Sequence, residues 1–513
     1  MLRNIMLRNI MAAFVLLASL SGVANAGPAA CEKRSNNTTK KLLECVTLDG
    51  VRAHQAAFQG IADLAGGTRA SGTPGYEYSA GYVYSQLEAA GYTPTVQYFG
   101  YDGFLPLGPS ALEQLSPGSV TYTERLDYQV MSQSDAGDVS APVTAVDLDL
   151  GLGNDSTSGC EPADFAGFPA GNIALLQRGA CNFSLKAENA AAAGAVGVIM
   201  FNQGNTPDRT GLSGGTLGTG YAGGIPVLFA TYALGEELAM TTGLSMRLFA
   251  NVYRGVVISA NIFAETAFGD PNNVVMVGAH LDSVVGGPGI QDNGSGSAAI
   301  LETAVQMAKV EPYNKVRFAW WGAEESGLVG STHYIDSLSQ EERDAIALYL
   351  NFDMIGSPNS VFFIYDGDDS DGVGAGPGPA GSAAIENVFE LYYSMLGEPY
   401  KGSDFTGRSD YGPFINVGIP AGGLFTGADG IKTAEEAGLW GGTAGDQYDP
   451  CYHLACDTFD NVNLRTLEIN SDAVAFATLK YAMDTSDVNG LRGKGNFVLK
   501  NRGTGYVGPL ATE

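Results

Sequence analysis

Carboxylates and imidazoles follow several apolar segments in the second half of the chain. The segment VVMVGAH ends at His280, with Asp282 two residues later, while KVRFAWWGA leads into Glu324 and Glu325, and YLNF leads into Asp353. In an open α/β sheet the carboxyl ends of the strands converge on one edge, so these side chains are predicted to meet there. Zinc prefers anionic oxygens and neutral imidazoles as ligands, so the pattern indicates a metal site.

Two further residues complete the candidate cluster. Asp292 stands in the glycine-rich stretch GPGIQDNGSG, just before a predicted helix, and His453 stands between Cys451 and Cys456. A disulfide between those cysteines would hold His453 in a short loop. Each motif alone is also typical of turns and structural ion pairs, but their convergence on strand ends and loops of one domain favours a metal site.

Other chemistries have less support. The remaining histidines, His54 and His333, lie in helix-like stretches without an acidic cluster, so no role is expected for them. No G-x-S-x-G motif follows a predicted strand, which disfavours a serine hydrolase. The glycine-rich stretch around Asp292 lacks the Lys-Ser or Lys-Thr ending of a phosphate-binding loop.

The elements that must position these residues alternate along the chain. Apolar spacing predicts helices over 48–65, 76–90 and 295–310, and the apolar segments named above read as strands. One face of the third helix carries Leu301, Ala304, Val305 and Ala308. That helix is therefore predicted to pack on a sheet. Alternating strands and helices predict an α/β fold with a mostly parallel, helix-covered sheet.

A segment of different amino-acid composition interrupts this alternation of strands and helices. From about Thr123 to Glu265 the chain has short strands rich in Asp, Ser, Gly and Val, which predicts an inserted domain. Within it, GNIALLQRGACNFSLKAENAAAAGAVGVIMFNQ predicts a strand, a helix and a second strand. The pattern around Arg178, Cys181, Gly194 and Gly197 resembles the protease-associated (PA) domain, which implies a smaller α/β insert.

Composition and charge restrict the class of protein. Residues 1–26 combine Arg3 and Arg8 with an apolar run of about ten residues and end in Ala24-Asn25-Ala26, which predicts a signal peptide cleaved after about Ala26 and not a membrane anchor. Without this segment the net charge changes from −28 to −30. Such an acidic surface repels phosphate backbones and anionic membranes, so nucleic-acid and membrane partners are not expected.

The cysteines fall into near neighbours along the chain. Six cysteines allow fifteen pairings, but short separations in an exported chain favour local disulfides. The expected pairs are Cys31 with Cys45, Cys160 with Cys181, and Cys451 with Cys456. These disulfides, together with the signal peptide, predict a secreted or periplasmic protein.

Six motifs carry a resemblance to the M28 family of zinc peptidases. They are GAHLDSV, GIQDNGSG, WWGAEESGLVGS, NFDMIGS, GRSDYGPF and CYHLACDT. The similarity is greatest to the secreted bacterial leucyl aminopeptidases, over about 300 residues outside the insert. It implies an aminopeptidase that releases N-terminal, large apolar residues from peptides by water activated on a two-zinc centre. The enzyme is expected to act as a monomer.

The resemblance also implies a role for each residue of the cluster. His280 and Asp353 would hold one zinc, Glu325 and His453 would hold the other, and Asp292 would bridge both. Glu324 would act as the general base. A cis peptide bond is implied between Asp292 and Asn293.

Further residues would assist the reaction. Tyr452 would donate a hydrogen bond to the oxyanion, and Asp282 would orient His280. The free α-amine of the substrate would contact Glu324, Asp353 and the carbonyl of Arg408.

The expected organisation is a signal peptide at 1–26, the M28 peptidase domain in two parts at 27–122 and 266–489, the PA domain at 123–265, and a C-terminal tail at 490–513. Three alternatives remain open at this stage. A carboxypeptidase of the same family would need a basic pocket, for which Arg408 is the main candidate. A glutaminyl cyclase would use one zinc, and a non-catalytic binding or receptor-like relative would typically lack ligands or the base.

Overall fold

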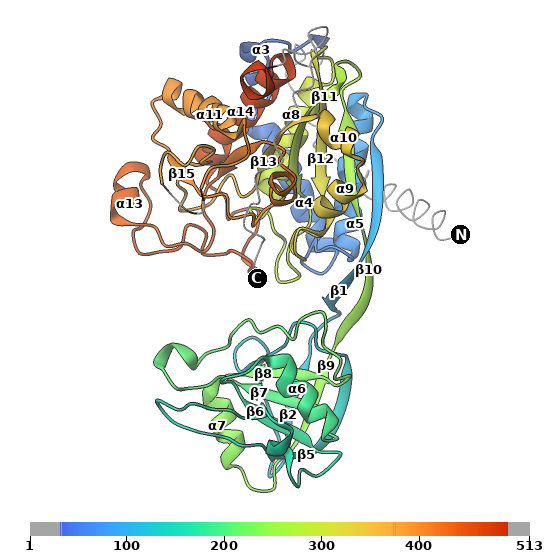
Figure 1. Ribbon diagram of the computed structural model, residues 1–513, viewed down its shortest axis with the longest axis vertical. Helices are drawn as coiled ribbons and strands as arrows, with labels where there is room; N and C mark the ends of the chain where they lie inside the picture. Colours follow the sequence, from blue (N-terminus) through green and yellow to red (C-terminus); the bar gives the residue numbers. More distant parts are fainter. Residues whose placement is uncertain (1–30, 32, 373, 375, 491–513) are drawn as a thin grey trace, which may run out of the picture. The chain divides into compact units, whose positions relative to one another are not determined.

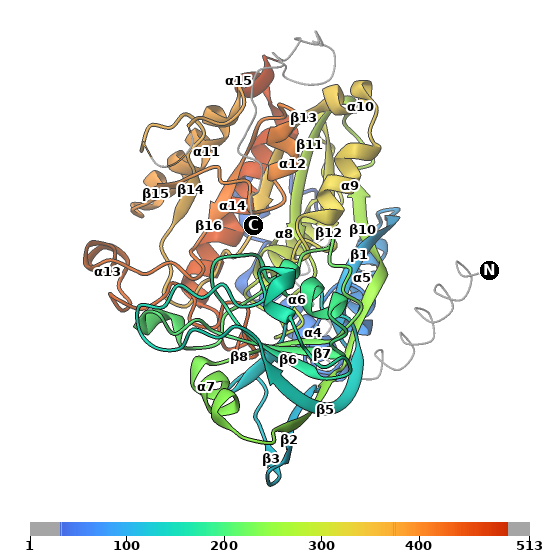
Figure 2. The ribbon, with the colours of Figure 1, turned by 60° about the horizontal axis from the view of Figure 1, so that its bottom comes forward.

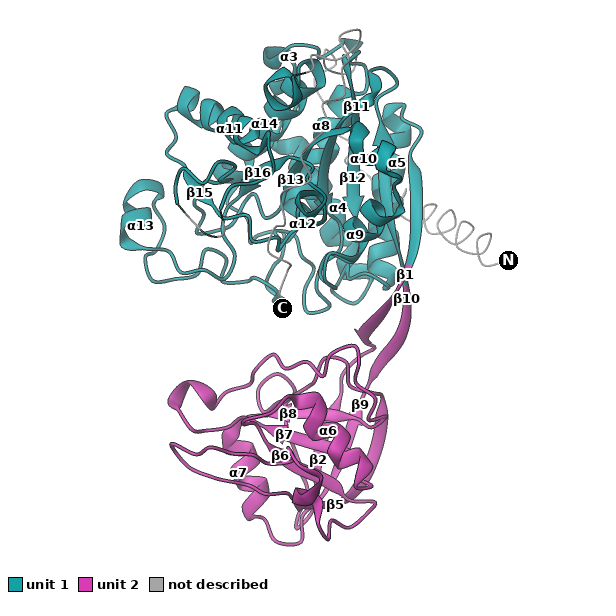
Figure 3. Cartoon of the chain, in the orientation of Figure 1, with its two compact units in different colours: residues 1–99, 258–513 teal, residues 100–257 magenta. Residues whose placement is uncertain are grey.

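A computed structural model describes residues 31–490 except 32, 373 and 375. The expected signal peptide and nearly all of the expected C-terminal tail lie outside these residues. The chain forms two compact units, one made of residues 1–99 and 258–513 and the other of residues 100–257 (Figure 3). In the part of the chain that the structure describes, no helix combines the length and apolar character needed to cross a membrane.

The larger unit is built on a mixed sheet with strand order β1-β10-β12-β11-β13-β16-β14-β15 (Figure 1). Its strands are β1 (Thr95–Pro106), β10 (Val252–Glu265), β11 (Asp270–His280), β12 (Asn314–Trp321), β13 (Ile346–Phe352), β14 (Phe363–Tyr365), β15 (Lys401–Ser403) and β16 (Ala421–Phe425). The central strands β12, β11, β13 and β16 run parallel, whereas β10 and β14 join the sheet antiparallel. The predicted α/β fold with a mostly parallel sheet is confirmed.

Helices cover both faces of this sheet (Figures 1 and 2). They are α3 (Thr39–Leu43), α4 (Leu48–Leu64), α5 (Pro74–Ala90), α8 (Gly294–Met307), α9 (Val329–Ser337), α10 (Gln340–Ala345), α11 (Ser382–Leu396), α12 (Gly412–Asn416), α13 (Ala434–Trp440), α14 (Leu464–Met483) and α15 (Ser486–Asn489). Successive residues of β11 point to opposite faces, so Val275 and Val277 join the core beneath α8, while Val274 and Met276 join the core that includes residues of α9 and α12. Burial on both faces explains why this strand is almost continuously apolar.

Helix α8 lies against the sheet as its apolar face predicts. Leu301 and Ala304 are fully buried, and Val305 and Ala308 pack at the margin of the same core. The helix begins after Asn293, whose side chain accepts a hydrogen bond from the backbone N–H of Gly296 and so caps the first turn. Because α8 starts directly after the loop that carries Asp292, its position fixes one end of that loop.

The smaller unit is a separate α/β body with strand order β3-β2-β9-β5-β6-β7-β8-β4 (Figure 3). Its elements are β2 (Ala111–Ser116), β3 (Val120–Thr121), β4 (Tyr128–Val130), β5 (Gly137–Ala145), η1 (Pro162–Phe165), β6 (Ile173–Gln177), α6 (Phe183–Ala192), β7 (Gly197–Phe201), η2 (Pro207–Arg209), β8 (Val227–Ala230), α7 (Tyr232–Met240) and β9 (Ser245–Ala250). The predicted strand, helix and strand correspond to β6, α6 and β7, and β5 through β8 are parallel.

The limits of this unit, 100 and 257, differ from the expected insert of 123–265. The chain leaves the larger unit along β1 and returns along β10, and each of these long strands contributes residues to both units. The amino-acid composition does not change at either limit of the unit, because β1 and β10 each continue across it.

The three expected disulfides, Cys31–Cys45, Cys160–Cys181 and Cys451–Cys456, are all formed. One expectation about the histidines was incomplete. His54 does have an acidic neighbour, because its Nε2 lies 3.3 Å from Glu302 Oε2, and its Nδ1 lies 2.7 Å from the Tyr82 hydroxyl. Glu302 is 248 residues away in the sequence, so only the packing of α4 on α8 brings the two side chains together.

Candidate metal centre

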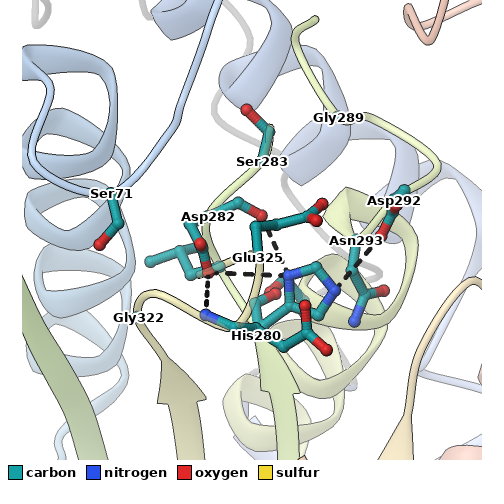
Figure 4. A network of polar contacts seen from close by, with 12 residues as sticks. Ser71, His280, Asp282, Ser283, Gly289, Asp292, Asn293, Gly322 and Glu325 are labelled. Carbon is teal, nitrogen blue, oxygen red and sulfur yellow. Dashed lines mark hydrogen bonds and ion pairs between the residues drawn. The ribbon is translucent and has the colours of Figure 1, made fainter. Parts of the chain in front are cut away.

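His280 occupies the carboxyl end of the central strand β11. Its Nε2 lies 3.1 Å from Asp353 Oδ1 and 3.3 Å from Asp292 Oδ1, and the imidazole is 1% exposed. On the other side of the ring, Nδ1 lies 3.1 Å from the Asp282 carbonyl oxygen and 3.7 Å from the Asp282 carboxylate (Figure 4). The ring is therefore held between a polar contact at Nδ1 and two carboxylates at Nε2.

The Asp292 carboxylate is shared between two histidines. Its Oδ1 faces His280, and its Oδ2 lies 3.2 Å from His453 Nε2. His453 Nε2 also lies 3.1 Å from Glu325 Oε2. The Nε2 atom of each histidine thus faces two carboxylates, and Asp292 belongs to both pairs.

The sheet order accounts for this convergence. The register places His280 opposite Trp321 and Gly278 opposite Asn351, so β11, β12 and β13 end at one edge of the sheet. After β12 the chain turns sharply at Ala323, where φ is 59°, and this turn directs the next two side chains, Glu324 and Glu325, into the cluster. The turn is fastened by the Glu324 N–H, which donates to Asp282 Oδ1 over 3.2 Å.

His453 reaches the cluster from a loop instead of a strand. The Cys451–Cys456 disulfide closes this loop, and His453 adopts the left-handed conformation with φ of 58°. A non-glycine residue rarely adopts this conformation unless the surrounding structure enforces it. The Tyr452 ring stacks on the His453 ring with centroids 3.8 Å apart, which restricts the imidazole further.

The protonation of the cluster reflects its excess of acidic groups. Burial disfavours the charged imidazole of His453, but hydrogen bonds to Asp292 and Glu325 prevail and raise its pKa to about 10. Burial raises the pKa of Glu325 to about 7, and the charge of Asp292 adds to the effect. Burial likewise raises the pKa of Glu324 well above its usual range. The site therefore favours positive charge at its centre.

These residues could hold divalent metal ions. His280, Asp292 and Glu325 offer ligand atoms within 4.8 Å of one another, and so do His280, Glu324 and Asp353. Glu325 Oε1 is buried without a hydrogen-bond partner among the described residues. Imidazole nitrogens and carboxylate oxygens are ligand types that zinc prefers, so these residues could hold zinc.

Two neighbours of the cluster were not singled out from the sequence. Ser409 donates a hydrogen bond to Asp353 Oδ2 over 2.6 Å. Asp410 is buried close to His280 and Asp353, and this burial raises its pKa to about 7. Both residues lie in the motif GRSDYGPF, but nothing in that motif alone distinguishes them from turn residues.

Three other sequence-based expectations can be located. Tyr452 lies next to His453 and is partly exposed. Arg408 has an exposed side chain and directly precedes Ser409. The peptide bond between Asp292 and Asn293 is cis, as the resemblance implies.

Comparison with known proteins agrees with the resemblance seen in the sequence. The profile of peptidase family M28 matches residues 261–478, and the profile of the PA domain matches residues 139–238. An aminopeptidase of Pseudomonas aeruginosa is 55% identical over 454 residues, which cover 88% of this chain and 84% of the relative. Leucine aminopeptidase 2 of Arthroderma otae is 39% identical over 419 residues, covering 81% of this chain and 80% of the relative.

Solved structures show the same similarity. An aminopeptidase from Aneurinibacillus sp. strain AM-1 superposes with a TM-score of 0.59 at 27% identity, covering 86% of this chain and 96% of that chain. A zinc aminopeptidase from Bacillus subtilis superposes with a TM-score of 0.59 at 25% identity, covering 84% and 94% of the two chains.

Proposed function

Because the chain belongs to peptidase family M28, with a PA domain inserted in its peptidase domain, we propose that it is an exported aminopeptidase with a two-zinc centre. The observation that carries this proposal is the position of the Asp292 carboxylate, with one oxygen facing His280 and the other facing His453. A carboxylate shared in this way is what two ions about 3.5 to 4 Å apart require.

The proposed ligands divide between the two ions. His280 and Asp353 would hold one zinc, Glu325 and His453 would hold the other, and Asp292 would bridge them. The short distances from each imidazole to its carboxylate partners support this division. Zinc supplies a Lewis acid that lowers the pKa of water towards neutrality and polarises a peptide carbonyl.

Glu324 is proposed as the general base and, later, the general acid. Its carboxylate belongs to the cluster with His280 and Asp353, yet the neighbouring Glu325 is the residue whose carboxylate faces His453. Glu324 would accept a proton from the attacking water and transfer it to the departing amine. Asp282 would hold both partners in place, since it contacts His280 Nδ1 and accepts a hydrogen bond from the Glu324 N–H.

Tyr452 is proposed to stabilise the carbonyl oxygen as negative charge develops on it. Stacking on His453 keeps the phenol beside the cluster. Burial and the surrounding carboxylates raise the pKa of Tyr452 well above its usual value, so the hydroxyl retains its proton and can act as a hydrogen-bond donor.

Recognition of a free N-terminus distinguishes an aminopeptidase from other exopeptidases. We assign the α-amine to Glu324, Asp353 and the backbone carbonyl of Arg408, because a positively charged amine is attracted to this acidic cluster. Ser409 ties the Arg408 segment to Asp353. A large apolar N-terminal residue is proposed by analogy with the relatives named leucine aminopeptidase.

The disulfides support export to an oxidising compartment, the periplasm or the exterior. All of the proposed ligands come from the larger unit of one chain, which supports action as a monomer.

The proposal is tested with a chromogenic leucine amide that has a free amine and with its N-acetylated counterpart. We expect hydrolysis of only the free-amine compound, loss of activity after chelation, and recovery on addition of zinc. Glu324→Gln is expected to bind zinc but hydrolyse neither compound appreciably. Hydrolysis of the acetylated compound, or activity that survives complete metal removal, would contradict the proposal.

A further inference from the structure

The segment 281–293 connects the two halves of the metal centre. It begins directly after His280 and ends at the cap of α8, and it carries Asp292 near its end. It contains no helix or strand of its own, and its Leu281 N–H continues the β11–β12 ladder by donating to the Trp321 carbonyl over 2.8 Å. Farther along, side chains from outside the segment bind its backbone and so help to place the Asp292 carboxylate.

Arg69 binds the segment from one side. Its guanidinium is completely buried and donates from Nε to the Pro288 carbonyl over 2.8 Å, from Nη2 to the Gly289 carbonyl over 2.5 Å, and from Nη1 to the Leu281 carbonyl. The Arg69 backbone N–H also donates to Ser283 Oγ over 3.0 Å. One side chain thus joins the beginning of the segment to its later part.

Asp457 binds the segment from another direction. Its Oδ1 accepts from the Gln291 N–H over 2.8 Å, and its Oδ2 accepts from the Asp292 N–H over 3.0 Å. Its own carbonyl accepts from the Ile290 N–H over 3.1 Å. Asp457 is 2% exposed, and Asn461 donates to Oδ1 over 3.2 Å, so the carboxylate is itself fixed.

The partners of Arg69 are unusual for a fully buried arginine. The hydrogen bonds of its guanidinium go to backbone carbonyls, and no carboxylate of the described residues lies within ion-pair distance. Burial lowers the pKa of Arg69 to about 10, and the charges of Asp457, Asp282 and Asp292 oppose this effect. The planar guanidinium directs N–H groups from three separate nitrogens in fixed directions. A lysine ammonium carries its N–H groups on one nitrogen and cannot reproduce this arrangement.

We propose that Arg69 and Asp457 are positioning residues of the metal centre, which together hold the backbone of segment 281–293 so that Asp292 reaches both His280 and His453. Neither residue would touch the metal ions or the substrate. This inference rests on the two-zinc centre proposed above. It adds two residues to the site, Arg69 from the loop between α4 and α5 and Asp457 from the segment that follows the Cys451–Cys456 loop.

The test compares zinc binding by the mature full-length protein with that of Arg69→Lys and Asp457→Asn. Arg69→Lys keeps the charge and loses the three directed bonds, while Asp457→Asn keeps the volume and places an amide N–H₂ against a backbone N–H. Zinc affinity is measured by competition with a fluorescent chelator. We expect each variant to bind zinc about 10- to 100-fold more weakly, the range typical of residues that support metal ligands.

A spectroscopic readout separates positioning from general loss of stability. The cobalt-substituted variants should show altered visible absorption bands, since these depend on ligand geometry. Arg317→Lys serves as the matched control, because Arg317 is half-buried and pairs with Glu265 and Tyr334 away from the site. The control should keep wild-type zinc affinity and spectrum.

Each outcome distinguishes the two proposals. If the wild type binds no zinc, the proposed function fails. If the wild type binds two ions and both variants keep its affinity and cobalt spectrum, the positioning roles are refuted while the two-zinc centre stands. If Arg69→Lys does not fold, Asp457→Asn alone decides, because wild-type zinc affinity in that variant would overturn the inference.

Discussion

Removal of the Cys451–Cys456 disulfide is expected to weaken metal binding selectively at the Glu325–His453 position. In the intact protein the disulfide closes a loop with a sequence separation of 5 and holds His453 at φ 58°. With Cys451→Ser and Cys456→Ser together, the free loop would relax, and metal binding would have to restore its conformation.

The size of this effect follows from the loop length. The chain-entropy relation for a loop of about five residues gives about 2 kcal/mol at 25 °C. The left-handed conformation of a non-glycine residue adds about 1 kcal/mol. The sum of about 3 kcal/mol corresponds to a loss of up to about 100-fold in zinc affinity.

The assay is a chelator competition that resolves the two zinc-binding steps. One step should weaken by about 30- to 100-fold and the other should change much less. The double variant Cys160→Ser and Cys181→Ser is the control, because that disulfide lies in the smaller unit. Unchanged zinc affinity in both steps would refute the reasoning and would mean that hydrogen bonds such as Cys451 N–H to Asp449 Oδ1, at 2.9 Å, hold the loop alone.

Three further predictions address the base, the core and the pH dependence of stability. Glu324→Gln should lower kcat by about 10²- to 10⁴-fold, because proton transfer is lost. Isothermal titration calorimetry should show that the variant still binds zinc. A kcat near the wild-type value would contradict the assignment of Glu324 as the general base. Leu301→Ala, at a fully buried site of α8, should lower the free energy of unfolding by about 2 to 5 kcal/mol in urea titrations, whereas Leu391→Ala, 55% exposed, should cost less than about 0.5 kcal/mol. Burial raises the pKa of Glu386 to about 7, so in the unfolded chain this carboxyl ionises at lower pH than in the folded protein. The free energy of unfolding should therefore fall as pH rises from about 4.5 through 7, by up to about 3 kcal/mol. Glu386→Gln should reduce that decrease when urea midpoints are compared across this pH range with chelator present. An equal dependence of the urea midpoint on pH in the two proteins would contradict the prediction.

Much of the fold was predictable because it depends on local patterns. The apolar run ending at His280 and the one-sided helix around Leu301 each record burial in a short stretch of sequence, and burial is decided by the packing layers of an α/β domain. The disulfides were predictable for a similar reason, since each joins cysteines no more than 21 residues apart.

The boundaries of the smaller unit were less predictable. Strands β1 and β10 continue from one unit into the other, so hydrophobic pattern and composition do not change where the unit begins. The PA match to residues 139–238 lies inside the predicted insert of 123–265, but composition alone does not locate the edges of the unit.

The sequence by itself determined which residue types follow which strands, and so it identified the candidate ligands His280, Asp353 and Glu325. Only the tertiary structure decided how these groups meet. The sheet order β12-β11-β13 differs from the order of the strands along the chain, and it brings Glu325 and Asp353 to either side of His280. The sharing of Asp292 between two imidazoles, and the three carbonyls bound by Arg69 more than 200 residues away, are likewise set by packing. Such contacts leave no periodic signal, because a side chain selects its distant partner by geometry and charge in the folded protein, not by spacing in the sequence.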